Sequence, residues 1–195
     1  EEKQTIARRC RSLIENGDTL FLDNSTTCYY IAREIRDMHV TVATNNLMII
    51  NLFSSIDNIR LVSIGGEFSH AEQAFYGNIA SNILDDYYFD KAFISCRTLS
   101  LEHGVTESTD QWALIRRKAI ARSNKHYLVA DKSKFDHTSF VRISGFEELT
   151  AIVTSHPLDS RWHQETEMLG CRIIDGSPSL LNPNELDMGN SSSYH

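Results

Sequence analysis

The chain has 195 residues, 41% of them hydrophobic, and contains only three prolines and nine glycines. This composition suits one folded domain with a sizeable core and argues against a disordered chain. The formal net charge of −7 argues against a broad basic surface of the kind that grips the DNA backbone, although a local basic patch is compatible with it. No apolar run approaches the ~18 residues of a membrane span, so we expect no membrane partner.

The cysteines are scattered and carry no metal-binding spacing. No C-x-x-C pair occurs among Cys10, Cys28, Cys96 and Cys171. We therefore expect no metal site, no cofactor and a reducing cytoplasmic environment. The sequence opens on Glu1 without a signal peptide or a methionine, which we interpret as a fragment of a longer protein.

Predicted helices and short buried strands alternate from the start of the chain. Apolar residues at helix spacing predict a first helix over 6–14, ended by Asn16-Gly17-Asp18. The elements predicted next are a strand at 19–23, a helix at 26–36 capped by Thr26 or Thr27, a strand at 40–43, a helix at 47–52 and a strand at 59–64.

The same alternation continues to the end of the domain. The later predicted elements are a helix at 72–85, a strand at 88–94, a helix at 110–123, a strand at 126–130, a strand at 150–154, a helix at 158–169 and a strand at 172–174. Such alternation indicates an α/β fold with a mostly parallel, twisted sheet and helices on both faces. Residues 1–176 are expected to form this domain, and residues 177–195, which lack periodicity, a flexible tail.

Polar or glycine residues follow five of the predicted strands, at the sheet edge where parallel sheets bind ligands. The first cluster, residues 23–27, opens a helix and could hold a phosphate, or could be an ordinary N-cap cluster. The other clusters are Thr44-Asn45-Asn46, Gly65-Gly66, Ser95-Cys96-Arg97-Thr98 with residues 104–107, and residues 131–134. Each alone fits a solvated loop, but together they predict an anion-binding pocket.

These residues, in this order, resemble the C-terminal sensor domain of the DeoR family of transcriptional regulators over roughly residues 3–175. The resemblance rests on Leu22-Asp23, Thr26-Thr27, residues 42–45, Gly65-Gly66, Gly77, residues 90–94, Gly104, Thr106, Asp131 and Ser133-Lys134-Phe135. It implies a fold similar to ribose-5-phosphate isomerases and glucosamine-phosphate deaminases. It also implies a homo-oligomeric regulator, by family habit a repressor of a sugar-utilisation operon. A winged helix-turn-helix outside this chain would bind operator DNA.

The resemblance further implies that a phosphorylated sugar or related metabolite binds here and alters DNA binding. The expected effector-binding residues are Asp23, Asn24, Ser25, Thr26, Thr27, Thr44, Asn45, Gly65, Gly66, Arg97, Gly104, Glu107, Asp131 and Lys134. The chain departs from the family pattern at Ser25, where glycine is usual, at residues 95–98, and at Trp112, where glutamate is common. Arg97 would suit a more anionic ligand if it faces the pocket; otherwise it is a solvated loop residue.

Two other functions compete with a sensor. A sugar-phosphate isomerase or deaminase of the same fold needs a general base, but residues 95–98 contain no carboxylate, so we expect no enzyme, although Glu102 and Glu107 lie nearby in the sequence. A pure assembly module would leave the polar clusters unexplained. The Arg116-Arg117-Lys118 run is interpreted as a solvated helix face.

Overall fold

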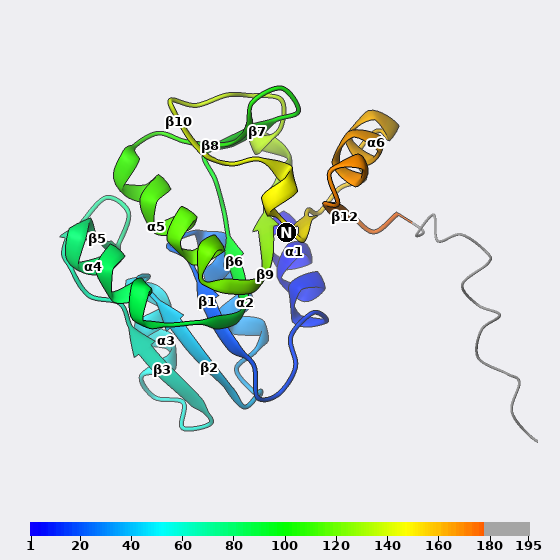
Figure 1. Cartoon of the computed structure of the whole chain (residues 1–195). Helices are drawn as coiled ribbons and strands as arrows, with labels where there is room; N and C mark the ends of the chain where they lie inside the picture. Colours follow the sequence, from blue (N-terminus) through cyan, green and yellow to red (C-terminus); the bar gives the residue numbers. More distant parts are fainter. Residues whose placement is uncertain (178–195) are drawn as a thin grey trace, which may run out of the picture.

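The computed structural model describes residues 1–177, and its centre is a seven-stranded sheet of order β12-β11-β9-β6-β1-β2-β3 (Figure 1). Every pairing in this sheet is parallel. The strands are β1 (Thr19–Leu22), β2 (Val40–Thr44), β3 (Ile59–Ser63), β6 (Phe89–Ile94), β9 (Ser123–Val129), β11 (Ala151–Val153) and β12 (Arg172–Ile174). The predicted parallel α/β sheet is therefore confirmed, with strand bounds within three residues of those expected.

Helices cover both faces of the sheet because its buried strands present apolar side chains in both directions. Within β1, Leu20 and Leu22 pack in the cluster formed with α1, α2 and α3, whereas Phe21 packs in the cluster formed with α4, α5 and α6. The helices are α1 (Glu2–Arg11), α2 (Thr26–Glu34), α3 (Leu47–Phe53), α4 (Gly77–Ile83), α5 (Asp110–Ala121) and α6 (Ser160–Met168).

Two small antiparallel sheets were not predicted. One has the order β10-β8-β7, and the other is the hairpin β4-β5. Their strands are β4 (Glu67–Ser69), β5 (Ala74–Tyr76), β7 (Thr98–Ser100), β8 (Gly104–Glu107) and β10 (Val141–Ser144). The short 3-10 helices are η1 (Leu84–Asp86), η2 (Lys132–Lys134) and η3 (Phe146–Glu148).

The helix predicted over 72–85 is wrong in its first part. Residues 74–76 form β5, and α4 begins only at Gly77. The backbone N–H of Leu47 donates to Gln73, and that of Phe75 donates to Asn45. These long-range bonds hold the segment extended, overriding its local preference.

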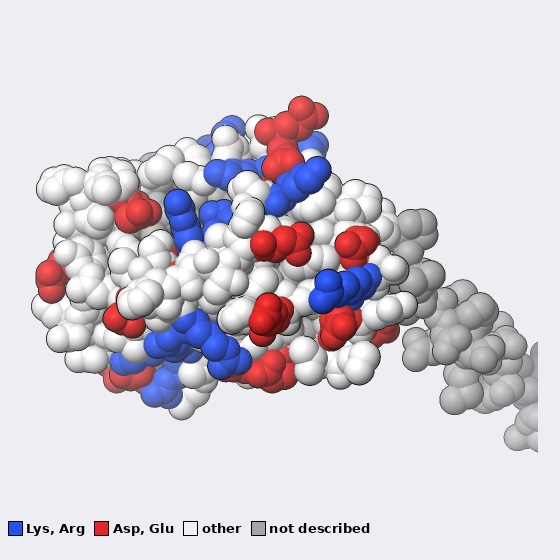
Figure 2. All heavy atoms as spheres, turned by 90° about the horizontal axis from the view of Figure 1, so that it is seen from above, with Lys and Arg blue, Asp and Glu red and all other residues white. Residues whose placement is uncertain are grey.

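The predicted flexible tail, apart from Ser177, lies outside the described residues. Within residues 1–177 no helix combines the length and the apolar character that crossing a membrane demands. Seen from above, basic and acidic side chains are interspersed over the surface (Figure 2). This face therefore lacks the continuous positive charge that would favour binding to a DNA backbone.

Candidate functional site

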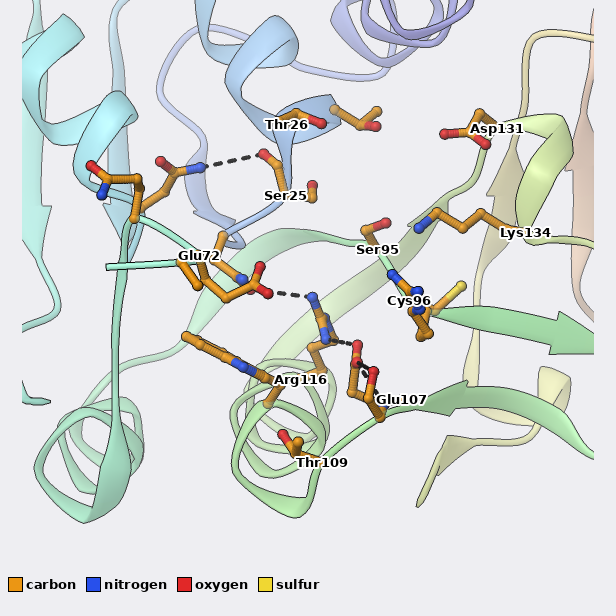
Figure 3. Close-up of a pocket in the computed structure, with 18 of the residues that line it drawn as sticks. Ser25, Thr26, Glu72, Ser95, Cys96, Glu107, Thr109, Arg116, Asp131 and Lys134 are labelled. Carbon is orange, nitrogen blue, oxygen red and sulfur yellow. Dashed lines mark hydrogen bonds and ion pairs between the residues drawn. The ribbon is translucent and has the colours of Figure 1, made fainter. Parts of the chain in front are cut away.

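A cavity of about 420 Å³ lies at the carboxyl ends of β1, β2, β6 and β9 (Figure 3). Parallel sheets collect ligands at this edge, and the volume suits a small metabolite. The walls comprise residues 24–27, 71–73, 95–97 and 107–109, together with Lys3, Asn46, Met48, Trp112, Arg116, Asp131 and Lys134.

The N-terminus of α2 forms one wall of this cavity. Ser25, and not Thr26 or Thr27 as predicted, is its N-cap, because the Ser25 Oγ accepts from the Cys28 N–H at 3.1 Å. The Thr26 and Thr27 N–H groups belong to the first helical turn and have no acceptor within residues 1–177. Lys3 reaches this wall from α1 and donates its Nζ to the Thr26 Oγ1 at 2.6 Å. Free N–H groups beside an ammonium favour an anion here.

Two largely buried residues present hydroxyls to the cavity that have no partner within residues 1–177. Thr27 is 3% exposed and Ser95 is 5% exposed, yet both line the cavity. In the described part of the chain neither hydroxyl makes a hydrogen bond, although the other polar groups around them do. Neither hydroxyl oxygen is among the buried polar atoms that lack a partner, so both are open to the cavity that their residues line. Thr27 and Ser95 are therefore positioned for an incoming polar group.

A buried ion triad forms the floor beneath these groups. The Arg116 Nε donates to the Asp23 Oδ2 at 3.0 Å, and the Arg116 Nη1 donates to the Glu107 Oε2. Arg116 Nη2 also donates to the Asn24 Oδ1 at 3.2 Å. Burial alone would raise the pKa of Asp23, but the Arg116 charge and the Ser95 and Ser25 hydrogen bonds outweigh it and lower that pKa. The triad is thus a fixed, ionised floor.

Asp23 joins two walls of the cavity rather than facing its interior. It is fully buried and does not line the cavity. Its Oδ1 accepts from the Ser25 N–H at 2.8 Å, and its Oδ2 accepts from the Ser95 N–H at 2.7 Å. Asp23 therefore ties the loop before α2 to the segment after β6. The prediction that Arg116 lies on a solvated face is wrong, because its side chain is only 6% exposed and pairs with two carboxylates.

The opposite wall carries cations and a carboxylate. Asp131 caps η2, its Oδ1 accepting from the Ser133 N–H at 3.0 Å, and Lys134 extends from η2 toward Ser95 and Cys96 (Figure 3). Arg97 is exposed and lines the cavity. The prediction had left open whether this side chain faces the pocket, and its position allows it to meet a ligand.

The predicted site residues divide into two groups. Eight of them line the cavity: Asn24, Ser25, Thr26, Thr27, Arg97, Glu107, Asp131 and Lys134. Asp23 is buried behind this lining and braces two of its walls. The others lie outside the lining: Thr44, Asn45, Gly65, Gly66 and Gly104. Effector binding by the first group stays a prediction.

The residues outside the lining have structural partners instead. Thr44 Oγ1 donates to the Leu22 carbonyl at 2.7 Å, and Asn45 Nδ2 donates to the Phe75 carbonyl at 2.8 Å. A Cβ at Gly66 would lie 2.5 Å from a hairpin carbonyl oxygen, and one at Gly104 would lie 2.5 Å from a carbonyl in β10. Both glycines therefore permit close backbone packing.

Sequence reasoning missed most of the remaining lining. Asn46 was within a recognised polar cluster, and it caps α3 through the Met48 N–H while its Nδ2 donates to the Ser25 carbonyl at 3.3 Å. Lys3 and Arg116 come from helices far from the strand ends in sequence, so no local signal marked them. The turn at 71–73 was missed because the hairpin was predicted as helix.

Within residues 1–177 the lining thiol is protonated and the acidic groups are not arranged to hold a metal ion. Burial raises the pKa of Cys96 to about 12, so this thiol is protonated at neutral pH. Across residues 1–177, no group of three His, Cys, Asp or Glu side chains is arranged to hold a metal ion. The cavity offers donors, hydroxyls and fixed charges, which suit binding.

The fold and the cavity together define an α/β domain that presents a polar ligand site at the carboxyl ends of a parallel sheet. The sequence model of the DeoR C terminal sensor domain matches residues 1–156. The chain belongs to this family.

Curated relatives are named as regulators. The HTH-type transcriptional regulator IolR of Bacillus subtilis is 35% identical over 165 residues, 84% of this chain and 66% of the relative. The lactose phosphotransferase system repressor of Staphylococcus aureus is 34% identical over 157 residues, 80% of this chain and 62% of the relative. An uncharacterised HTH-type regulator of Bacillus subtilis, YulB, is 32% identical over 81% of this chain and 61% of the relative. The chain thus spans less than two thirds of these relatives' length.

Solved structures of low sequence identity share the fold. A D-ribose-5-phosphate isomerase in complex with phospho-erythronic acid aligns with a TM-score of 0.50 and 13% identity over 68% of this chain and 52% of that chain. The eIF2B beta subunit of Chaetomium thermophilum aligns with a TM-score of 0.57 and 9% identity over 87% of this chain and 52% of that one. The expected ribose-5-phosphate isomerase-like fold is confirmed.

Proposed function

We propose that this chain is the effector-sensing part of a transcriptional regulator of sugar metabolism, and that its cavity binds a phosphorylated sugar or a related metabolite. The observation that carries the proposal is the wall built by α2. Two free backbone N–H groups, the Lys3 ammonium and the unpartnered Thr27 hydroxyl converge there. A phosphate monoester supplies acceptors and negative charge for all of them.

The sugar moiety would extend toward η2 under this proposal. Asp131 would accept hydrogen bonds from ligand hydroxyls, and Lys134 would donate to an oxygen of the ligand. The Asp23–Arg116–Glu107 floor would not bind the ligand. Its role would be to hold both walls at a fixed separation before the ligand arrives.

Operator DNA binding and oligomerisation belong to the whole regulator. The first is proposed because the relatives are named HTH-type regulators and repressors, and the second from the family resemblance. A segment preceding this chain would bind operator DNA, and the regulator would act as a homo-oligomeric repressor in the cytoplasm. The ligand would shift the population between two arrangements of the regulator, because it binds one of them more tightly. Lys3 lies on α1 and contacts the α2 wall, so α1 would carry the signal toward that preceding segment.

A thermal-shift screen of the full chain tests this proposal. The compounds are glucose 6-phosphate, fructose 6-phosphate, fructose 1-phosphate, ribose 5-phosphate and glycerol 3-phosphate, each beside its unphosphorylated parent. A ligand at ~100 times its Kd adds about 2.7 kcal/mol of stability, a rise of roughly 5–10 °C for a domain of this size. Stabilisation by a phosphorylated compound and not by its parent is expected, and it should be lost in Thr27→Val. Equal shifts for parent and phosphate would contradict a phosphate site.

The same samples test the isomerase or deaminase alternative. The Asp23 and Glu107 carboxylates are paired with Arg116, and the Asp131 carboxylate caps η2. Glu72 also lines the cavity, but it lies exposed on the turn between β4 and β5. We therefore expect the stabilising compound to be recovered unchanged after overnight incubation with the chain. A product peak in the chromatogram would instead establish turnover.

A further inference from the structure

Two of the cations that line the cavity are not paired with an acid of the described chain. Within residues 1–177 the Arg97 guanidinium and the Lys134 ammonium have neither an ion pair nor a side-chain hydrogen bond. Arg116 differs, because Asp23 and Glu107 neutralise it. Lys3 also differs, because it already lies against Thr26 in the α2 wall.

Arg97 and Lys134 reach the cavity from neighbouring strands. Arg97 follows β6 and Lys134 follows β9, and these strands pair in parallel with Phe93 opposite Tyr127. Burial chiefly raises the pKa of the Cys96 thiol, and the Lys134 charge is the largest influence that lowers it. Figure 3 likewise shows Lys134 directed toward Ser95 and Cys96.

The Ser95 hydroxyl completes this second cluster. Ser95 is 5% exposed, lines the cavity and has no hydrogen-bond partner for its hydroxyl among the described residues. Two acids with buried carboxylates line the cavity, and both already have partners: the Asp131 Oδ1 accepts from Ser133, and Glu107 pairs with Arg116. Glu72 also lines the cavity, but it is exposed on the turn of the β4-β5 hairpin.

We propose that the effector carries two anionic groups, a phosphate at the α2 wall and a second anion held by Arg97, Lys134 and the Ser95 hydroxyl. The effector class is then a phosphorylated sugar acid or a sugar bisphosphate. This inference rests on the proposed function and names the ligand class for the same cavity. The second group is a carboxylate or a phosphate, since a planar guanidinium and a hydroxyl can donate to either.

The test compares matched ligands by calorimetric titration of the full chain. One pair is 6-phosphogluconate and glucose 6-phosphate, which differ by a terminal carboxylate. The other is fructose 1,6-bisphosphate and fructose 6-phosphate, which differ by a phosphate. The proposal expects the doubly anionic member of at least one pair to bind about tenfold to a hundredfold more tightly. The pair that shows the gain identifies the second anion. The gain should shrink as salt is raised, because the Arg97 end of the cavity is open to solvent.

Two arginine variants locate the effect. Arg97→Gln should bring the affinity ratio of the responding pair to within about twofold, while the monophosphate keeps its affinity. Arg60→Gln removes an equal charge from an exposed position on β3 outside the cavity and should preserve the full ratio. A preserved ratio in Arg97→Gln would overturn the proposal, and so would loss of the ratio in both variants.

The outcomes separate this inference from the proposed function. If monophosphates bind and both ratios stay near one, the cavity takes a singly anionic ligand, and the second-anion proposal is wrong. If no phosphorylated compound binds in either pair or in the thermal-shift screen, the proposed function fails, and this inference falls with it.

Discussion

The ion triad under the cavity makes Arg116→Met a decisive perturbation. Methionine keeps much of the side-chain volume but leaves Asp23, which is 0% exposed, and Glu107, which is 6% exposed, without their cation. At an effective dielectric constant of 20 a charge pair 4 Å apart is worth about 4 kcal/mol before desolvation. Breaking a buried pair by removing one partner costs about 3–5 kcal/mol. We therefore expect the free energy of unfolding to fall by about 3–5 kcal/mol at pH 7.

The loss should depend on pH in a defined direction. In the wild type the pKa of Asp23 is lowered, so its stabilising contribution is complete at pH 7 and is lost only as the pH falls through the lowered pKa. Without Arg116, burial dominates and raises that pKa above its unfolded value. The folded variant then takes up a proton more readily than the unfolded chain, so lowering the pH to 5 should recover part of the lost stability.

Urea unfolding followed by circular dichroism at pH 7 and pH 5 measures both effects. Arg117→Met is the matched control, because Arg117 is the exposed neighbour on α5 and should change the unfolding free energy by less than about 1 kcal/mol. A loss below about 1 kcal/mol for Arg116→Met, or an equal loss at both pH values, would refute the account of the triad.

Three further predictions concern other parts of the chain. Gly66→Ala should cost about 1–3 kcal/mol in urea unfolding, because Gly66 has φ +142° and an added Cβ would lie 2.5 Å from a hairpin carbonyl; Gly65→Ala, with nothing within 4 Å of its Cβ, should be neutral. Hydrogen bonds from Leu158, Ser177 and His163 outweigh burial and lower the pKa of Asp175 to about 2. The stabilising contribution of Asp175 is therefore complete above its unfolded pKa and is lost as the pH falls toward 2. As the pH is lowered toward 2, amide exchange should accelerate in α6 before it does in the central strands. Lys134→Ala should lower the affinity for the stabilising sugar phosphate at least about tenfold in calorimetry and leave the melting temperature of the free protein unchanged. Lys132 is exposed and outside the cavity lining, so Lys132→Ala should keep the affinity.

The parallel sheet could be predicted because each of its strands has a recognisable pattern within its own short segment of sequence. Thr19–Leu22 is a short apolar run followed by helix-capping residues, and that pattern recurs along the chain. The β4-β5 hairpin could not be predicted in this way. Its extended form depends on backbone hydrogen bonds between residues 73–75 and residues 45–47, and nothing within the segment reveals those partners.

The candidate site shows the same division. The polar cluster at 24–27 lies at the cavity as the strand-end rule predicts, because parallel strands bring their carboxyl ends to one edge. Arg116 was misjudged because a charged helix residue normally faces water, and its partner Asp23 lies 93 positions away in sequence. Gly65 and Gly66 follow a strand as predicted, but that strand, β3, lies at one edge of the sheet, and the pair lies outside the cavity lining.

The central claim is that a phosphorylated metabolite binds against the N-terminus of α2. The most direct test is a titration of the isotope-labelled full chain with the stabilising sugar phosphate, followed through backbone amide chemical shifts. The account predicts saturable changes that centre on Thr26, Thr27 and Ser95 and that the unphosphorylated parent does not reproduce. Saturable changes centred instead on the shallow groove between Arg33 and Asp57, with the α2 wall unmoved, would contradict it.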